Sequence, residues 1–392
     1  MLRLVNKLWR YSKYFTDSKK VWRWPRQSDV LIYDICGQEM VLEYLQPWNP
    51  EFLHVRNELF NVPVFLVSIF RRGRRVDAYI DCFIEKVRPK LVVTFIDNNL
   101  TFYSISQRHS SLKTMFIQNG TRGYYADVFE LLDAVSIQAR DAMTVDYIMP
   151  FGSIVGSEFA RHIKGNVIPI GSLKNNHLPK AHIRQTDVVA FVSQWHKDGL
   201  FMHEVFYSQE SFFSQADQPI IQFLVTYTHK NNKRLMIVPR NNKNSSDRAA
   251  EEAYFRELVG DDVAFSEPDG AYSSYQTVDS AAVVVGVDTT LLYEAIARGT
   301  KAAIFSTRSN LLGIKGFTYG WPGEYLDDGP FWTNHPNPES FERIMDHLFE
   351  INDEQWHAEL AEYSFDKVMT YDSGNGTLKS ILTKELGSIP NP

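Results

Sequence analysis

The sequence has little cysteine and no long apolar run. Only two cysteines, Cys36 and Cys82, occur in 392 residues, which excludes the disulfide framework of small secreted domains. We expect both to be buried thiols in a reducing compartment. No stretch of about 18 apolar residues is present to span a membrane, and Trp9, Arg10 and Lys13 interrupt any signal-peptide core. These absences predict a cytoplasmic protein.

An overall excess of positive charge is also missing. The chain has 41 Lys and Arg against 47 Asp and Glu, a net charge of −6, whereas a general nucleic-acid binder usually carries a basic excess. We therefore expect no nucleic-acid partner. The exception is residues 1–26, where eight Lys and Arg face Asp17 alone beside several apolar residues. Two interpretations stay open, namely a helix on the anionic inner-membrane surface and a solvated helix packed on its domain.

Short apolar runs alternate along the whole chain with longer amphipathic segments. This pattern predicts an α/β fold in which helices join parallel strands. The predicted strands are Val30–Tyr33, Phe52–Val55, Val64–Val67, Leu91–Phe95, Thr114–Ile117, Ala134–Ile137, Thr144–Met149, Val167–Ile170, Val188–Val192, Leu235–Val238, Val263–Phe265, Ala282–Val287 and Ala302–Phe305. The predicted helices are Gln38–Leu45, Asp77–Val87, Asp217–Tyr227, Arg248–Leu258, Thr290–Arg298, Pro338–Ile351 and Asp353–Val368.

The alternation stops once and then restarts, which predicts two Rossmann-like domains facing each other across a cleft. We expect an N-terminal acceptor domain at 1–173, a polar linker at 174–185 and a donor domain at 186–370. Residues 371–392 are expected to form a helix and tail that pack back on the first domain. Ligands of open α/β sheets bind beyond the carboxyl ends of the strands, so functional residues should follow strands.

The segment from Val285 to Phe305 carries the strongest binding signal. An apolar strand ends there, and Asp288 or Thr289 is suited to cap the helix that follows. The free N–H groups and positive dipole end of such a helix suit a phosphate, and the hydroxyls of Thr289 and Thr290 add donors. Glu294, one turn later, is placed to bind ribose hydroxyls. The alternative is an ordinary capped helix with Glu294 on a solvated face.

Three further loops should reach the same cleft from the donor domain. Ser193 follows the first strand, Arg240 follows the second and Asp269 follows the third. A planar guanidinium at Arg240 suits a phosphate or a sugar carboxylate. We therefore count these three residues among the donor-binding candidates.

Two motifs of the N-terminal half suggest an acceptor site. Asp97 and Asn98 follow one predicted strand, while Gln118, Asn119 and Arg122 follow another. Amides and a carboxylate at these positions suit sugar hydroxyls or acid–base chemistry, although Asn-Asn and Asn-Gly are also ordinary turn residues.

A third N-terminal loop leads to Glu158. This glutamate is a candidate general acid or base if it faces the cleft. Alternatively it serves only the dipole of a helix that starts nearby.

The motifs 96–99, 117–120 and Asp288-Thr289-Thr290 with Glu294 resemble those of bacterial surface-polysaccharide transferases of the GT-B fold. Over its full length the chain looks most similar to the retaining β-Kdo transferases of the WbbB type. The resemblance implies CMP-Kdo as donor and a lipid-linked lipopolysaccharide or O-antigen glycan as acceptor. It also implies a double displacement through a carboxylate nucleophile, with no other cofactor.

The sequence departs from this family at the nucleophile. The family's aspartate falls on Asn232, and an amide is a poorer nucleophile than a carboxylate, so this copy would be impaired. Asn232 also precedes a predicted strand instead of following one. Asp97, Asp269 and Asp288 remain alternative carboxylates.

Two rival functions stay open. One is a sugar-nucleotide 2-epimerase of similar architecture, and the other is an inactive glycan-binding module. The tail 387–392 is typical of a domain boundary and suggests further domains in a longer chain. No metal is expected, because no Asp-X-Asp pair follows a strand and no His/Cys cluster occurs.

Overall fold

The computed structural model describes residues 18–56, 58–71, 75–124, 127–179, 185–202, 205–261, 263–267, 270 and 272–388. The first 17 residues of the basic segment lie outside these ranges, as does the donor candidate Asp269. Within the described part of the chain, no helix is long and apolar enough to cross a membrane.

The N-terminal domain is built on a six-stranded parallel sheet in the order β3-β2-β5-β6-β7-β8. Its strands are β2 (Val30–Tyr33), β3 (Glu51–Leu53), β5 (Leu91–Thr94), β6 (Lys113–Ile117), β7 (Thr144–Met149) and β8 (Lys164–Val167). Every residue of β2 and β5 is buried, because helices cover both faces of a parallel sheet. The strand order reverses between β2 and β5, where such sheets open a crevice at their carboxyl edge.

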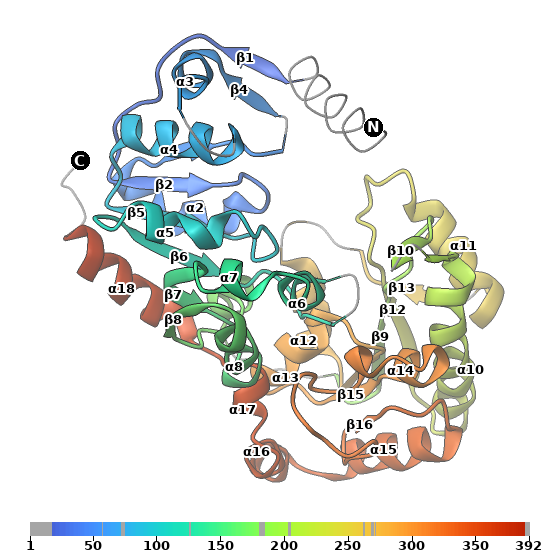
Figure 1. The fold of residues 1–392 in the computed structure, drawn as a ribbon. Helices are drawn as coiled ribbons and strands as arrows, with labels where there is room; N and C mark the ends of the chain where they lie inside the picture. Colours follow the sequence, from blue (N-terminus) through green and yellow to red (C-terminus); the bar gives the residue numbers. More distant parts are fainter. Residues whose placement is uncertain are drawn as a thin grey trace.

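The helices of this domain are mostly short. They are α2 (Gln38–Leu45), α4 (Arg75–Val87), α5 (Ile105–Arg108), α6 (Val128–Asp133), α7 (Ile137–Arg140), α8 (Ser153–His162) and α9 (Leu173–His177). A small additional layer comprises α3 (Val62–Ser68) and a parallel strand pair, β1 (Lys19–Val21) with β4 (Leu59–Asn61). Figure 1 shows this layer at the end of the domain that lies away from the C-terminal domain.

The C-terminal domain contains a second six-stranded parallel sheet in the order β13-β12-β9-β14-β15-β16. Its strands are β9 (Val188–Val192), β12 (Arg234–Val238), β13 (Ala264–Phe265), β14 (Val283–Gly286), β15 (Ala302–Phe305) and β16 (Trp332–Thr333). In chain order this is 3-2-1-4-5-6, the arrangement of dinucleotide-binding domains, whose switch point lies between the first and fourth strands. Here those strands are β9 and β14.

Six helices and a hairpin complete the C-terminal domain among the described residues. The helices are α10 (Gln215–Lys230), α11 (Arg248–Val259), α12 (Ser273–Ser280), α13 (Thr290–Ala297), α14 (Thr307–Leu312) and α15 (Pro338–Glu350). The hairpin pairs β10 (Leu200–Met202) with β11 (Val205–Tyr207).

The chain then returns to the first domain through α16 (Asp353–Glu362), α17 (Phe365–Val368) and α18 (Gly376–Leu386). Buried residues of α18, including Leu378 and Leu382, pack into a core shared with Val30 and Leu91 of the N-terminal sheet. A larger core contains residues of both domains. The two domains are therefore joined by a common apolar interior as well as by the chain.

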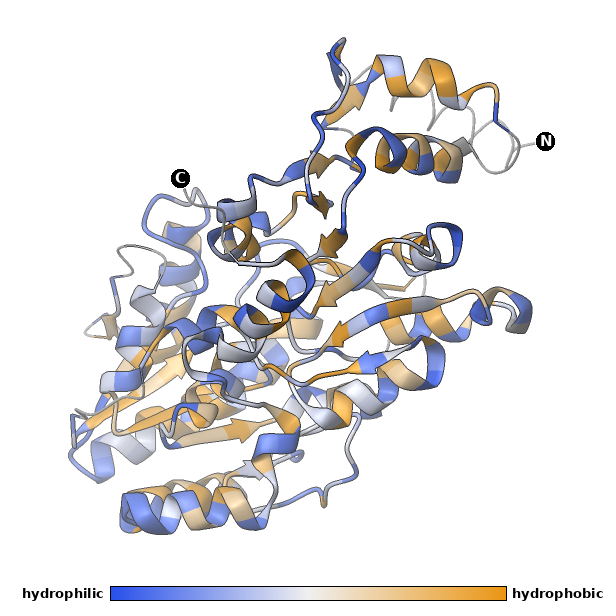
Figure 2. Ribbon diagram, turned by 90° about the vertical axis from the view of Figure 1, so that its left-hand side faces the viewer, coloured by the Kyte–Doolittle hydropathy of each residue, from blue (hydrophilic) through white to orange (hydrophobic). Residues whose placement is uncertain are grey.

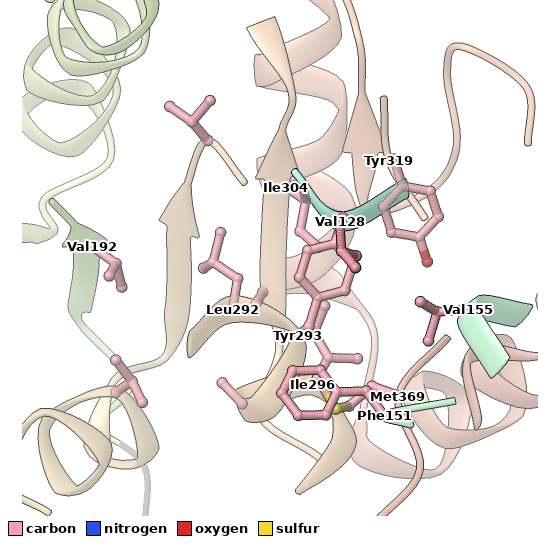
Figure 3. Packing of buried hydrophobic residues seen from close by; sticks show 14 of the residues in the cluster. Val128, Phe151, Val155, Val192, Leu292, Tyr293, Ile296, Ile304, Tyr319 and Met369 are labelled. Carbon is pink, nitrogen blue, oxygen red and sulfur yellow. The ribbon is translucent and has the colours of Figure 1, made fainter. Parts of the chain in front are cut away.

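Figure 3 shows part of this shared interior. Phe151 and Val155 of the N-terminal domain lie beside Tyr293 and Met369. All four side chains are buried. Apolar burial of this kind holds the walls of any cleft between the domains in a fixed relation.

Several predicted elements are wrong. Val64–Val67 lies in α3, because the Asn61 side chain accepts a hydrogen bond from the Val64 N–H (3.1 Å) and Pro63 stands in the first turn. Ala134–Ile137 is the junction of α6 and α7, and β8 ends at Val167, where the predicted strand starts. The long helix predicted at 353–368 is broken at Ser364, whose φ is 51°.

The prediction that both cysteines are buried is half wrong. Cys82 is buried in α4, whereas Cys36 is exposed in the loop after β2. Both are free thiols.

Candidate active site

A cleft of about 570 Å³ lies between the two domains at the carboxyl ends of both sheets. The N-terminal domain contributes loops after β5 and β6, and the C-terminal domain contributes loops after β9, β12 and β14. The polar and charged side chains among the lining residues are Asn98, Gln118, Thr121, Arg122, Asp127, Gln194, His196, Arg240, Asp288, Arg308 and Thr318. Aromatic residues line the rest, among them Phe212, Phe213, Phe317 and Trp321. A polar rim on an aromatic wall is typical of a small-molecule site.

Arg308 lines the C-terminal wall of the cleft, a role that the sequence interpretation missed. Its Nη1 donates to both carboxylate oxygens of Asp288 (2.5 and 2.6 Å) and lies 3.3 Å from the Gln194 side-chain oxygen. The guanidinium also lies 4.5 Å from the ring centre of Phe212. Arg308 is 2% exposed, so the ion pair is held rigidly. Its position just after β15 is the signal that could have identified it.

The three residues that begin α13 have different roles. Asp288 lines the cleft through its pair with Arg308. Thr289 is the N-cap, and its side chain makes no capping hydrogen bond. The Thr290 hydroxyl accepts from the Thr121 N–H (3.1 Å) and contacts the Thr121 hydroxyl (3.0 Å). Thr290 therefore joins the two domains, a role that differs from the predicted donor contact.

Glu294 does not lie among the residues that line the cleft. It is 4% exposed and accepts a hydrogen bond from the Tyr275 hydroxyl (2.8 Å). Burial raises the pKa of Glu294, while Ser172 and Tyr275 oppose that rise by hydrogen bonding. A carboxylate enclosed in this way does not suit the predicted ribose contact.

A buried glutamate, Glu251 of α11, shapes the two loops that follow β9 and β12. Its carboxylate accepts from the Ser193 hydroxyl (2.6 Å) and from the backbone N–H groups of Arg240 and Asn241 (both 2.9 Å). The predicted donor residue Ser193 is itself buried, so it acts through this network. Glu251 was missed because a glutamate on an amphipathic helix normally faces solvent.

Arg240 lines the cleft and is exposed. Its guanidinium lies 3.5 Å from the Trp195 carbonyl oxygen, and within the described residues no carboxylate lies at ion-pair distance. His196, which also lines the cleft, stacks on Phe213. Burial and then the Arg240 charge lower the pKa of His196, so its imidazole is neutral at pH 7.

Arg240 and His196 also border a second, polar hollow of about 290 Å³. Lys197, Asn241 and Ser245 line its other sides. Because the two hollows share two residues, a ligand can extend from the cleft into this polar extension.

On the N-terminal wall, Arg122 is held in place by ion pairs with acidic side chains. It donates to both oxygens of Asp97, at 2.7 Å from Nε and at a shorter distance from Nη2. Nη1 lies 3.4 Å from Asp127, and Nη2 also contacts Asn119. Burial works to lower the pKa of Arg122, but the carboxylates of Asp97 and Asp127 outweigh it and raise that pKa.

Asp97 is therefore a positioning residue. It is fully buried and both of its oxygens bind Arg122, which does not suit the predicted catalytic role. The side-chain amide of Gln118 is also hydrogen-bonded within the protein. It donates to the Gly120 carbonyl (2.7 Å) and accepts from the Phe151 N–H (2.8 Å). Asn98 alone of the predicted acceptor residues is both exposed and in the cleft lining.

Two predicted catalytic positions lie away from the cleft. Asn232 is exposed in the turn between α10 and β12, at the amino ends of the parallel strands. Its φ of 51° explains the residue type, because asparagine tolerates this left-handed conformation. The structure therefore does not bring Asn232, the position of the nucleophile in the resemblance, into the cleft.

Glu158 lies in the second turn of α8 and is not among the cleft-lining residues. It pairs with Arg161 at 2.7 Å and lies 3.8 Å from His162. These contacts favour the structural alternative for Glu158.

Comparisons with known proteins agree with this architecture. The model of a family described as "putative O-antigen biosynthesis protein" matches residues 115–386. No curated protein matches the chain.

Solved structures resemble the chain in fold over nearly its whole length. A glycosyltransferase from Rickettsia africae is 11% identical, with a TM-score of 0.50 over 92% of this chain and 99% of that one. MnaA of S. aureus, solved with UDP, is 10% identical, with a TM-score of 0.51 over 93% and 99%. A "putative UDP-N-acetylglucosamine 2-epimerase" from Listeria monocytogenes is 12% identical, with a TM-score of 0.51 over 91% and 96%. These similarities confirm the predicted fold of two Rossmann-like domains.

Proposed function

Because the chain belongs to the O-antigen biosynthesis family whose model it matches, we propose that it is a glycosyltransferase that moves a sugar from a nucleotide donor to an O-antigen glycan. The observation that carries this proposal is the exposed guanidinium of Arg240 beside neutral His196, at the edge of the interdomain cleft. A cation without a carboxylate partner in such a place suits the phosphate of a donor.

The strand order supports a nucleotide on the C-terminal side. Gln194 follows β9 and Asp288 follows β14, the two strands at the switch point of the sheet. We place the donor phosphate on Arg240, the nucleoside towards the polar extension beside Lys197, and the sugar in the cleft. The acceptor glycan then approaches from Asn98 and Arg122 on the opposite wall.

We further propose CMP-Kdo as the donor. This molecule carries a phosphate and a sugar carboxylate, and the guanidinium of Arg240, which has no carboxylate at ion-pair distance among the described residues, suits either group. Retention through a double displacement requires a carboxylate at the anomeric carbon. Among the described residues, the carboxylates that line the cleft are Asp127 and Asp288, and each would have to leave its arginine to attack.

Two measurements test this proposal. Calorimetry with CMP and UDP should show tighter binding of CMP. Incubation with CMP-Kdo and an O-antigen oligosaccharide should give a Kdo-extended glycan, whose anomeric configuration NMR reports. Preference for UDP, with interconversion of a UDP-sugar when no acceptor is present, would instead establish an epimerase. Binding of a glycan without turnover of any donor would leave the inactive module.

A further inference from the structure

A set of exposed apolar residues lies on the N-terminal domain, outside the cleft. This α3 patch consists of Trp22, Leu66, Val67, Ile69, Phe70 and Val76. Phe70 is 89% exposed and Trp22 is 74% exposed. Figure 2 shows hydrophobic (orange) segments at the top of the molecule, at the height of α3 in Figure 1. Grouped apolar side chains of this size mark an interaction surface.

The backbone around the α3 patch is well ordered by hydrogen bonds. The N–H groups of Ile69 and Phe70 donate to the carbonyls of Phe65 and Val67, so the helical turn continues past the end of α3. Leu66, Ile69 and Phe70 consequently share one helical face. Each of these three side chains is exposed on a hydrogen-bonded helical turn. An ordered, exposed apolar face of this kind indicates an interaction surface.

The strand β1 brings Trp22 beside this helix. Residues 19–21 pair with residues 59–61, directly before α3. The Asn61 side chain then donates to the Arg23 carbonyl (2.8 Å) while also capping α3. Segments 18–26 and 62–71 thus form one layer (Figure 1).

The charge of this layer opposes that of the rest of the chain. Residues 18–26 contain Lys19, Lys20, Arg23 and Arg26, and residues 62–71 contain Arg71. Neither segment contains an aspartate or glutamate, although the whole chain has a net charge of −6. A local basic layer on an acidic protein fits an anionic partner.

We propose that the α3 patch docks on an anionic lipid bilayer. Phe70 and Leu66 enter the boundary between headgroups and acyl chains, Trp22 lies at the interface, and the surrounding lysines and arginines face lipid phosphates. A second copy of the chain fits less well, since a symmetric contact through this patch would bring the two basic layers together.

Docking here goes beyond glycosyl transfer and needs neither donor nor acceptor. Where the proposed function holds, it keeps the acceptor domain on the membrane that carries a lipid-linked glycan. Membrane residence then raises the effective concentration of that acceptor. The binding itself is measured separately from catalysis, so each proposal can fail alone.

Sedimentation of the full chain with vesicles tests the docking. The protein should sediment with vesicles of phosphatidylglycerol and phosphatidylcholine in equal parts, and remain in solution with phosphatidylcholine alone. The double variant Leu66→Ser/Phe70→Ser should partition at least about tenfold less strongly. Arg23→Glu should weaken binding to the anionic vesicles and leave nucleotide affinity unchanged.

The matched control is Leu326→Ser, which removes an apolar side chain that is 79% exposed on the C-terminal domain. This variant should sediment like the unmodified protein, and circular dichroism should show that all variants fold. Equal partitioning of the double variant and the unmodified protein would overturn the proposal. So would the absence of binding to anionic vesicles, or a dimer that the double variant dissociates, which would assign the patch to a second copy.

Discussion

At the scale of single residues, the site is organised by which charges are paired. Arg308 is held by Asp288, and Arg122 is held by Asp97 and Asp127. These arginines are neutralised and shape the walls. Arg240 has no such carboxylate in the described part of the chain, so its charge is available to a ligand. Pairing, more than residue type, therefore separates structural from binding arginines.

Replacing Arg240 with glutamine should raise the Kd for the donor nucleotide roughly tenfold to a hundredfold, since a charged hydrogen bond to phosphate is lost. Titration calorimetry measures the Kd of each variant for the nucleotide. Arg234→Gln is the matched control, because Arg234 lies at the opposite, amino end of the same strand β12 and pairs with Asp187. An equal loss of affinity in both variants would contradict the role of Arg240.

A second residue-scale prediction concerns Asp217 of α10, which is 1% exposed and whose carboxylate oxygens have no hydrogen-bond partner among the described residues. Burial raises its pKa to about 7, Arg308 opposes the rise, and Asp288 and Glu251 add to it. The unfolded chain loses this proton near pH 4, whereas the folded chain keeps it to about pH 7. Stability should therefore fall as the pH rises through this window, by up to about 4 kcal/mol.

Asp217→Asn removes the titration, so its free energy of unfolding should fall less than that of the unmodified protein between about pH 5 and pH 8. Urea denaturation at both pH values measures the difference. The comparison uses the change in the free energy of unfolding with pH in each protein. Any pH-independent cost of burying the introduced amide therefore cancels. Parallel slopes for the two proteins would contradict a buried, titrating Asp217.

At the scale of elements, close backbone contacts decide how the two domains meet. The N-cap of α8, Gly152, lies against the end of α17: a Cβ built on it would come within 2.2 Å of the Lys367 carbonyl and 2.4 Å of the Val368 carbonyl. Only glycine permits this approach. The start of α13 touches the other domain more loosely, through Thr290 and Thr121.

Gly152→Ala should accordingly lower stability by about 1–3 kcal/mol, because backbone atoms on both sides must shift. Thermal unfolding of the variant and of the unmodified protein measures this loss of stability. Gly120→Ala is the control in the same interface, since its Cβ would meet Thr290 at 3.9 Å, an ordinary contact. Equal stability of the two variants would show that α17 can move away from α8 without cost.

At the scale of the whole molecule, the last helix belongs to the first domain. Leu378 and Leu382 of α18 are buried with residues of the N-terminal sheet, and Tyr147 donates a hydrogen bond to Glu385. The chain thus passes twice between the domains. This return, together with the shared core, makes each domain depend on the other for stability.

Leu382→Ala should destabilise the protein by about 2–5 kcal/mol through the lost burial and the cavity left behind. The loss should appear as one cooperative shift of the melting temperature, with no separate early transition of the C-terminal domain. Calorimetry distinguishes these outcomes. Leu326→Ala, at an exposed leucine, should leave the transition unchanged.

The amino-acid sequence by itself determined the class of fold and most of its strands. Val30–Tyr33, Thr144–Met149, Val188–Val192 and Ala302–Phe305 form strands with the predicted bounds. Buried parallel strands are continuous apolar runs, and such runs are visible without tertiary information. The start of α13 at Thr289 and Thr290 was also recognisable, because polar residues between an apolar strand and a helix are a local pattern, although the Thr289 side chain makes no capping hydrogen bond.

Only the tertiary structure decided what the polar residues do. Asp97 and Ser193 follow strands, and Glu294 lies on the helix that follows β14, yet partners distant in sequence enclose each of them. Glu251 carries no local signal, and the position of Arg308 after β15 does not reveal its pair with Asp288, yet the two residues organise the cleft and its loops. Pairing and burial depend on which elements meet in space, so the roles of these charges follow from packing that short-range patterns do not contain.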